Sequence, residues 1–151
     1  MEKESDKPLE RDEVEDRVAK MESFSEQMVG DLEIAVRIRQ SYQAKVKAYS
    51  DFQASLLTMQ DIPEETPLVV LHDIGSGMMV EAAGTKRDTV FMDVGGEIFL
   101  RYSVSEAYFE SDRLIEKFEK RIEEQTKKIA SIKSSISVIG ALTGQLQETI
   151  G

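Results

Sequence analysis

The chain has 151 residues, of which 32% are charged and only 7% aromatic, and it carries a formal net charge of -10. This length fits one domain, and the high charge favours long solvated helices over a thick globular core. The negative charge argues against nucleic acids and anionic membranes as direct partners, because both would repel the chain.

The first segment, residues 1–12, is polar and contains Pro8, so it is predicted to be a flexible lead-in. It has no apolar core of the kind found in signal peptides, and no later stretch approaches the roughly 18 consecutive apolar residues that a membrane span needs. Cysteine is absent, which permits a reducing compartment. We therefore expect a cytoplasmic protein, with the nucleus as a second location.

Residues 13–62 are predicted to form the first helix. Spacings of four and three residues alternate through this segment, and mostly apolar side chains occupy the repeated positions. A repeat of this period indicates a helix that supercoils with a partner. Pro63 ends it, because the residue before a proline disfavours helical geometry. The repeated positions are Val14, Val18, Met21, Ser25, Met28, Leu32, Ala35, Arg39, Tyr42, Val46, Tyr49, Gln53, Leu56 and Gln60.

Residues 64–102 have a different character, because β-branched and apolar runs alternate with glycines. Four short strands are predicted, at 68–74, 78–83, 89–94 and 97–102. The tight turns Gly75-Ser76-Gly77 and Gly95-Gly96 join them into two hairpins. Isolated hairpins are marginally stable and exposed strand edges recruit other chains, so this region is predicted to mediate oligomerisation.

Residues 103–150 are predicted to form the second helix. Ser103 and Glu106 make a capping box at its start, in which each side chain satisfies a backbone donor. The four-three spacing returns, with isoleucine dominating its second half. The repeated positions are Val104, Tyr108, Ser111, Ile115, Phe118, Ile122, Gln125, Ile129, Ile132, Ile136, Ile139, Thr143, Leu146 and Ile150.

Two helices of similar length with matching apolar seams predict a long antiparallel coiled-coil hairpin. The expected fold class is therefore α+β, with two β-hairpins between the helices and a single domain over residues 13–151. No catalytic, cofactor or metal site is expected. His72 is the only histidine, cysteine is absent, and the glycine turns do not extend to a phosphate-binding motif.

Two stretches resemble the α class of prefoldin subunits. DIGSGMMVEAAGTKRDTVFMDV, from Asp73 to Val94, resembles the first-hairpin region of that family. GGEIFLRYSVSEAYFESDRLIEKFEKRI resembles the passage in which a glycine turn leads through the last strand into a Ser/Thr-x-x-Glu-Ala helix start. The order of helix, two hairpins and helix is that of the α class, whereas the β class has one hairpin.

The resemblance implies an ATP-independent chaperone or co-chaperone subunit of a hetero-oligomer, with no enzymatic activity. Its partners would be β-class prefoldin subunits, a second α-class subunit and unfolded client proteins. A chaperonin or an RNA-polymerase assembly scaffold would be a further partner. Two other interpretations stay open: an adaptor that uses the same fold without holding unfolded protein, and a plain coiled-coil rod that dimerises through its helices.

Two sets of residues are candidates for these contacts. At the tip, where the first helix starts and the second ends, apolar side chains either touch client proteins or simply close the seam; they are Val14, Val18, Met21, Phe24, Ile139, Leu142, Leu146 and Ile150. In the hairpins, apolar side chains either contact neighbouring subunits or fill a barrel; they are Val70, Ile74, Met78, Val80, Val90, Met92, Ile98 and Leu100.

Overall fold

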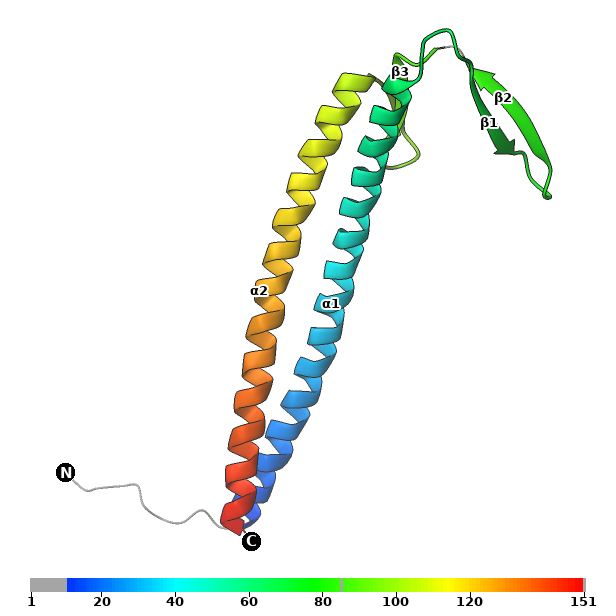
Figure 1. The fold of residues 1–151 in the computed structure, drawn as a ribbon. Helices are drawn as coiled ribbons and strands as arrows, with labels where there is room; N and C mark the ends of the chain where they lie inside the picture. The colour runs from blue at the N-terminus through cyan, green and yellow to red at the C-terminus, as the bar shows by residue number, and fades with distance from the viewer. Residues whose placement is uncertain (1–10, 85, 151) are drawn as a thin grey trace. The chain divides into compact units, whose positions relative to one another are not determined.

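The computed structural model describes residues 11–84 and 86–150, without the side chain of Ile150. Residues 1–10 of the predicted lead-in lie outside the described part, and Arg11 and Asp12 already belong to a helix. The element order is α1 (Arg11–Asp61), β1 (Leu68–Asp73), β2 (Met79–Gly84), β3 (Thr89–Asp93), β4 (Phe99–Ser103) and α2 (Val104–Ile150) (Figure 1). β1 pairs antiparallel with β2, and β3 with β4. The predicted fold, two long helices with two hairpins between them, is confirmed.

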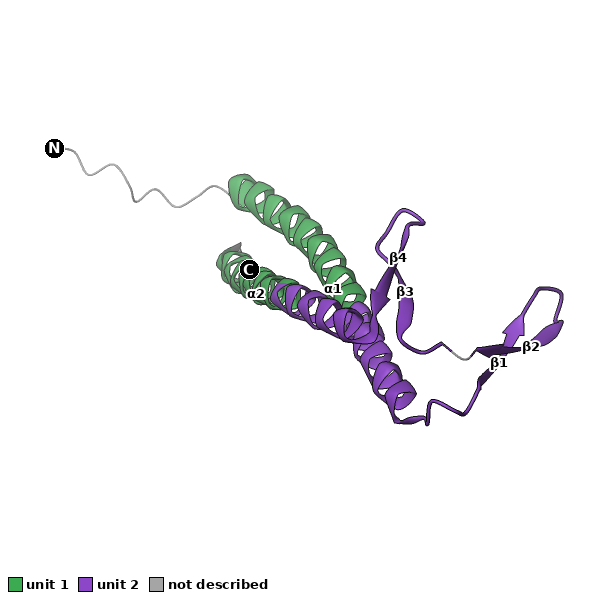
Figure 2. Cartoon of the chain, turned by 90° about the horizontal axis from the view of Figure 1, so that it is seen from above, with its two compact units in different colours: residues 1–42, 121–151 green, residues 43–120 purple. Residues whose placement is uncertain are grey.

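The chain divides into two compact units (Figure 2). The helical unit comprises residues 1–42 and 121–151, so it contains the first part of α1 and the last part of α2. The hairpin unit comprises residues 43–120, and it contains the remaining helical segments with both hairpins. Each unit has its own apolar contacts, which are described separately below.

In the helical unit, the positions of the four-three repeat are the less exposed ones, and Val14, Val18, Ala35 and Ile129 are buried. The helices run antiparallel here, because Met21 near the start of α1 meets Thr143 near the end of α2. The Thr143 Oγ1 atom lies 3.8 Å from the Met21 Sδ atom. A seam of this kind stabilises both helices by removing apolar surface from water.

A polar pair interrupts the seam of the helical unit. Equal steps of four and three residues, taken forward in α1 from Met21 and backward in α2 from Thr143, bring Arg39 opposite Gln125. The Arg39 Nε and Gln125 Oε1 atoms are both buried and, within the described residues, have no hydrogen-bond partner. One is a donor and the other an acceptor, so the two groups are chemically complementary. Polar groups at such positions fix helix register at a cost in stability.

The hairpin unit has a core in which the second hairpin packs on the helices. Leu56 of α1, Met92 of β3, and Val104 and Ala107 of α2 are buried together, with Tyr49, Phe52, Val90 and Tyr102 packed around them. The rings of Tyr49 and Phe118 stack with centroids 6.1 Å apart, which joins the two helices in this unit. The β3–β4 hairpin therefore contributes to the hydrophobic core of the hairpin unit.

α1 ends at Asp61 because Pro63 follows closely and disfavours helical geometry at Ile62. The side chain of Arg87, in the segment before β3, supplies donors to the carbonyl groups beyond the helix. Its Nη1 atom donates to the Ile62 oxygen at 2.9 Å and to the Pro63 oxygen at 2.7 Å. The guanidinium group of Arg87 thus links the segment before β1 to the segment after β2.

The two hairpins have the same turn. In the first, the Ile74 amide donates to the Met78 oxygen and the Asp73 Oδ1 atom accepts from the Gly75 amide at 2.7 Å. In the second, the Val94 amide donates to the Ile98 oxygen and the Asp93 Oδ1 atom accepts from the Gly95 amide at 2.8 Å. Three successive residues have positive φ in each turn; they are Gly75, Ser76 and Gly77, and Gly95, Gly96 and Glu97.

These turns are longer than predicted, and they displace the start of the second strand of each hairpin. The predicted strands at 78–83 and 97–102 are observed as Met79–Gly84 and Phe99–Ser103. The correction is largest at Glu97, where a φ of 63° places the residue in the turn. Left-handed geometry is uncommon for a residue other than glycine, so a turn that extends beyond Gly96 could not be expected from the residue types.

α2 begins with the predicted capping box. The Ser103 Oγ atom accepts a hydrogen bond from the Glu106 amide at 3.2 Å, and the Glu106 Oε2 atom accepts one from the Ser103 amide at 2.9 Å. The hydrogen bond that Glu106 accepts from the Ser103 backbone N–H lowers the pKa of its carboxyl group below the ordinary value. The bond from the Ser103 hydroxyl lowers it further, by a smaller amount. The ionised carboxylate therefore holds the first turn of α2 in place.

Replacing Glu106 with glutamine should make the stability less dependent on pH. A carboxylate with a lowered pKa stabilises the folded state above its unfolded pKa, about 4.3, and this contribution is lost as the pH falls through the folded value. Thermal midpoints measured by circular dichroism from pH 7 to pH 3 should show the wild type above Glu106→Gln at pH 7 and the difference shrinking towards pH 3. Glu119→Gln, an exposed change farther along α2, is the control, and equal pH profiles for all three proteins would contradict the assignment.

Candidate functional site

Most of the large exposed apolar side chains of the described residues lie on the two hairpins. We call this set the hairpin surface. Soluble monomers rarely leave so many neighbouring apolar groups in water, and surfaces of this kind mark sites of protein association. Its members are Val69, Val70, Leu71, Ile74, Met78, Met79 and Val80 in the first hairpin, and Phe91, Val94, Ile98, Phe99 and Leu100 in the second.

The β3–β4 hairpin has one face on the core and one face in solvent. Cross-strand partners share a face, so Met92 and Leu100 lie on one side while Phe91 and Arg101 lie on the other. Met92 is only 6% exposed, whereas its neighbour Phe91 is 68% exposed. The alternation of strand side chains explains the contrast, and it leaves an apolar outer face that no part of the described chain covers.

The β1–β2 hairpin is uncovered on both faces. Val70 and Val80 lie on one face, Leu71 and Met79 lie on the other, and all four are exposed. Each hairpin is also a two-stranded sheet, so every strand has one free edge. Free edges and bare apolar faces together favour pairing with strands of other chains.

Six of the eight predicted assembly residues are exposed on the hairpin surface. They are Val70, Ile74, Met78, Val80, Ile98 and Leu100. The other two, Val90 and Met92, pack within the chain on the helices of the hairpin unit. The prediction did not include Leu71, Met79, Phe91 or Phe99, although the unbroken apolar run from Leu68 to Leu71 was a signal of a second apolar face.

The predicted tip residues differ in accessibility. Val14 and Val18 are buried in the seam, Met21, Ile139 and Leu146 are half-buried, and the side chain of Ile150 lies outside the described residues. Phe24 and Leu142 are exposed. Both precede a seam position by one residue and lie near the Met21–Thr143 contact, so they flank the same side of the antiparallel pair. Contact between this pair and a client protein stays a prediction.

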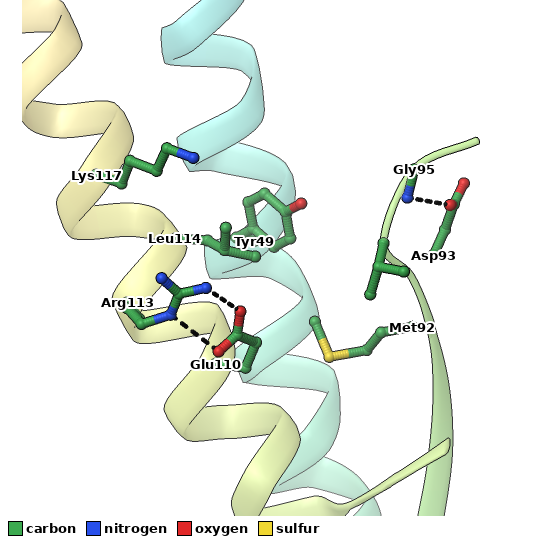
Figure 3. Close-up of a pocket in the computed structure, with 9 residues that line it drawn as sticks. Tyr49, Met92, Asp93, Gly95, Glu110, Arg113, Leu114 and Lys117 are labelled. Atoms are coloured by element: carbon green, nitrogen blue, oxygen red, sulfur yellow. Dashed lines mark hydrogen bonds and ion pairs between the residues drawn. The ribbon is translucent and has the colours of Figure 1, made fainter. Parts of the chain in front are cut away.

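A hollow of about 490 Å³ lies between β3 and the helices of the hairpin unit (Figure 3). Its two carboxylates already have partners within the chain: Asp93 accepts from the Gly95 amide, and Glu110 accepts from Arg113 Nε at 3.0 Å. The bonds from Arg113 hold the pKa of Glu110 below its ordinary value. An ionised, paired carboxylate is poorly suited to proton transfer at neutral pH.

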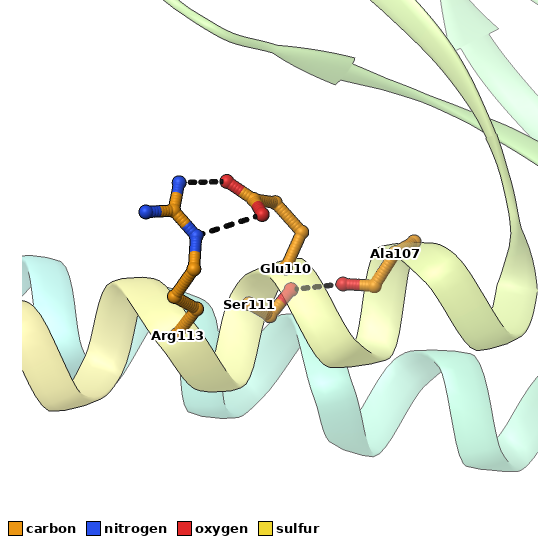
Figure 4. A network of polar contacts seen from close by, with 4 residues as sticks. All are labelled: Ala107, Glu110, Ser111 and Arg113. Carbon is orange, nitrogen blue, oxygen red and sulfur yellow. Dashed lines mark hydrogen bonds and ion pairs between the residues drawn. The ribbon is translucent and has the colours of Figure 1, made fainter.

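Other groups that carry chemistry elsewhere serve structural roles here. Ser111 is buried, and its Oγ atom donates to the Ala107 oxygen at 2.7 Å (Figure 4). His72 lies in β1. Within residues 11–84 and 86–150, no group of three or more His, Cys, Asp or Glu side chains is arranged to hold a metal ion. Neither helix of this part is long and apolar enough to cross a membrane.

The structure thus comprises two long helices, two hairpins whose turns have the same geometry, and an apolar hairpin surface. No curated protein matches the sequence. Among solved structures, the chain is similar to filamentous PFD from Methanocaldococcus jannaschii, determined by cryo-electron microscopy, with a TM-score of 0.65 and 20% identity over 80% of this chain and 98% of that chain. This likeness shows the fold. Residues 35–149 match the prefoldin subunit family, and the chain therefore belongs to the prefoldin family.

Proposed function

We propose that the chain is an ATP-independent chaperone subunit that works within a hetero-oligomer of prefoldin subunits. It assembles through the hairpin surface and holds unfolded client proteins at the exposed ends of its helices. The observation that carries this proposal is the set of bare apolar side chains on β1–β2 and on the outer face of β3–β4. Family membership and the fold support it, because prefoldin is a family of non-enzymatic chaperone subunits.

The proposed partners are β-class subunits, a second α-class subunit and unfolded client proteins. A chaperonin or an RNA-polymerase assembly scaffold would receive the clients or anchor the complex. Within the α class, Asp73-Ile74-Gly75 and Ile139-Gly140-Ala141-Leu142 favour the ubiquitously expressed transcript (UXT) protein, with prefoldin subunit five as the near alternative. A cytoplasmic location, together with a nuclear one, fits these partners.

Burial of Val14 and Val18 favours a second candidate, an adaptor that assembles without holding clients. Two apolar residues that close the seam are not available to an unfolded chain unless the helix ends separate. The exposed pair Phe24 and Leu142 is available without such a change. Substitution of Phe24 and Leu142 should therefore impair a chaperone and leave an adaptor unaffected.

Replacing Phe24 and Leu142 with serine should weaken the binding of unfolded protein by about 30-fold or more. Each exposed apolar side chain that is covered on binding contributes about 1 kcal/mol or more, and a tenfold effect on affinity corresponds to about 1.4 kcal/mol. The measurement is suppression of aggregation by the oligomer reconstituted with the β-class subunits that co-purify with the chain.

The matched control is the double change Val29→Ser and Ile34→Ser, which removes two exposed apolar side chains on other sides of the same unit. The control should suppress aggregation as the wild type does. If the intact wild-type oligomer fails to suppress aggregation, the chaperone proposal is wrong and the adaptor stands.

A further inference from the structure

The two hairpins form an internal repeat in which equivalent residues are 20 positions apart. Asp73 and Asp93 each accept a hydrogen bond from the amide of the second residue that follows. Ile74 and Val94 each close the turn through the same backbone bond, to the oxygen of the fourth residue that follows. A side chain in one hairpin therefore has a defined counterpart in the other.

The hairpins differ in chemistry directly after the turn. Met78 and Met79 occupy the places in the first hairpin that Ile98 and Phe99 have in the second. All four side chains are similarly exposed, at 57%, 59%, 57% and 61% in that order. A peroxide oxidises the thioether sulfur of methionine to a sulfoxide, whereas the hydrocarbon side chains of the second hairpin have no sulfur. At these positions the first hairpin is thus sensitive to oxidation and the second is not.

The exposed methionine pair differs from the other methionines of the described residues. Those others are buried or half-buried in the seam and in the hairpin unit, and they are Met21, Met28, Met59 and Met92. The reactivity of a thioether sulfur depends on access by the oxidant. Met78 and Met79 should therefore react first, and both belong to the hairpin surface.

We propose that Met78 and Met79 are oxidation sites through which a peroxide keeps a free subunit out of the oligomer. The proposal rests on the assembly role assigned above to the hairpin surface, and it adds a chemical control of that role. Each sulfur attacks one oxygen of hydrogen peroxide, so that the O–O bond breaks, an S=O bond forms and water is released. The sulfur loses two electrons and the peroxide gains them.

Sulfoxide formation changes the hairpin surface without disturbing the fold. The turn is held by backbone bonds, because the Met78 amide donates to the Gly75 oxygen and the Met78 oxygen accepts from the Ile74 amide. Neither Met78 nor Met79 belongs to the core of the hairpin unit. The oxidised chain should therefore stay folded, with a polar S=O group at two places on an apolar surface.

The sulfoxides oppose assembly because neighbouring subunits would have to cover them. Covering a polar group that finds no hydrogen-bond partner is unfavourable, and the apolar attraction of each methionine is lost at the same time. Association of the oxidised chain with β-class subunits should be about tenfold or more weaker. Once the hairpin surface is covered, the two sulfurs are shielded, so the reaction acts on the free subunit.

The test uses the full-length chain and the β-class subunits that co-purify with it. The free chain is treated with hydrogen peroxide, the peroxide is removed with catalase, and the chain is titrated into its partners. Peptide mass spectrometry should find sulfoxides at Met78 and Met79 before any appears at Met92, while the circular dichroism spectrum is unchanged. Size-exclusion chromatography should show a need for about tenfold or more oxidised chain to reach half incorporation. Methionine sulfoxide reductases of both epimer specificities should restore incorporation.

The matched variant is the double change Met78→Leu and Met79→Leu, which removes both sulfurs with little change in volume. Each protein is compared with its own untreated sample, and the peroxide effect should be absent from this variant but retained in Met59→Leu. Equal sensitivity of the double variant and the wild type overturns the proposal, as does normal incorporation of a wild type oxidised at both sites. Failure of the untreated wild type to enter the oligomer overturns the proposed function as well, so the two failures are distinguishable.

Discussion

Replacing Phe91 and Phe99 with serine is expected to abolish entry of the chain into a prefoldin-type oligomer while leaving the chain itself folded. Both rings lie on the outer face of β3–β4, away from the core that Met92 shares with the helices. Covering an aromatic side chain contributes about 1.5–3 kcal/mol, so losing two weakens association by about 100-fold or more. Size-exclusion chromatography of the chain mixed with its β-class subunits measures the loss.

Phe109→Ser provides the matched control for this experiment. Phe109 is 72% exposed, similar to Phe91, but it belongs to α2 and lies outside the hairpin surface. The control should enter the oligomer as the wild type does. Normal incorporation of the Phe91 and Phe99 variant, or equal failure of Phe109→Ser, would show that the outer face of β3–β4 is not the assembly surface.

Replacing Leu56 with alanine should lower the free energy of unfolding by about 2–5 kcal/mol. Leu56 is 1% exposed and lies in the core of the hairpin unit, so its removal leaves a cavity as well as a loss of buried apolar surface. The next residue, Leu57, is 49% exposed, and Leu57→Ala should cost less than about 1 kcal/mol. Urea denaturation followed by circular dichroism measures both values.

Leu56 and Leu57 are adjacent residues of the same type in the same helix, so a comparison of the two substitutions isolates the effect of burial. Similar losses for both would contradict the assignment of Leu56 to the core, because alanine favours a helix slightly more than leucine and propensity causes no loss at either position. A large loss of unfolding free energy for Leu56→Ala alone would show that packing of the helices against the second hairpin stabilises the fold.

The seam was predictable from the sequence because a four-three spacing constrains side chains over many turns. Val14, Val18, Ala35 and Ile129 were all assigned to it, and all four are buried. The capping box was predictable for the same kind of reason, because Ser103 and Glu106 act within a single turn of helix. Such local rules determine where an element begins and which stripe it buries.

The roles of the two strand faces were not predictable, because the period of a strand says which residues share a face but not what covers it. Val90 and Val70 have the same place in their hairpins, yet Val90 packs on the helices and Val70 is exposed. The difference arises from tertiary contacts of the second hairpin with Leu56 and Val104. The exposure of Phe91 and Phe99 was missed for this reason, since apolar residues occur on both sides of these strands.

The polar pair Arg39 and Gln125 restricts where residues can be inserted into the two helices. In the helical unit, equal steps away from the Met21–Thr143 contact bring the two polar residues to one level. Adding one heptad between Met21 and Arg39 would carry the arginine one heptad beyond Gln125, unless α2 gained a heptad between Gln125 and Thr143. Insertions in these helices should therefore arise in mirrored pairs, and a helix extended alone should slip or bulge.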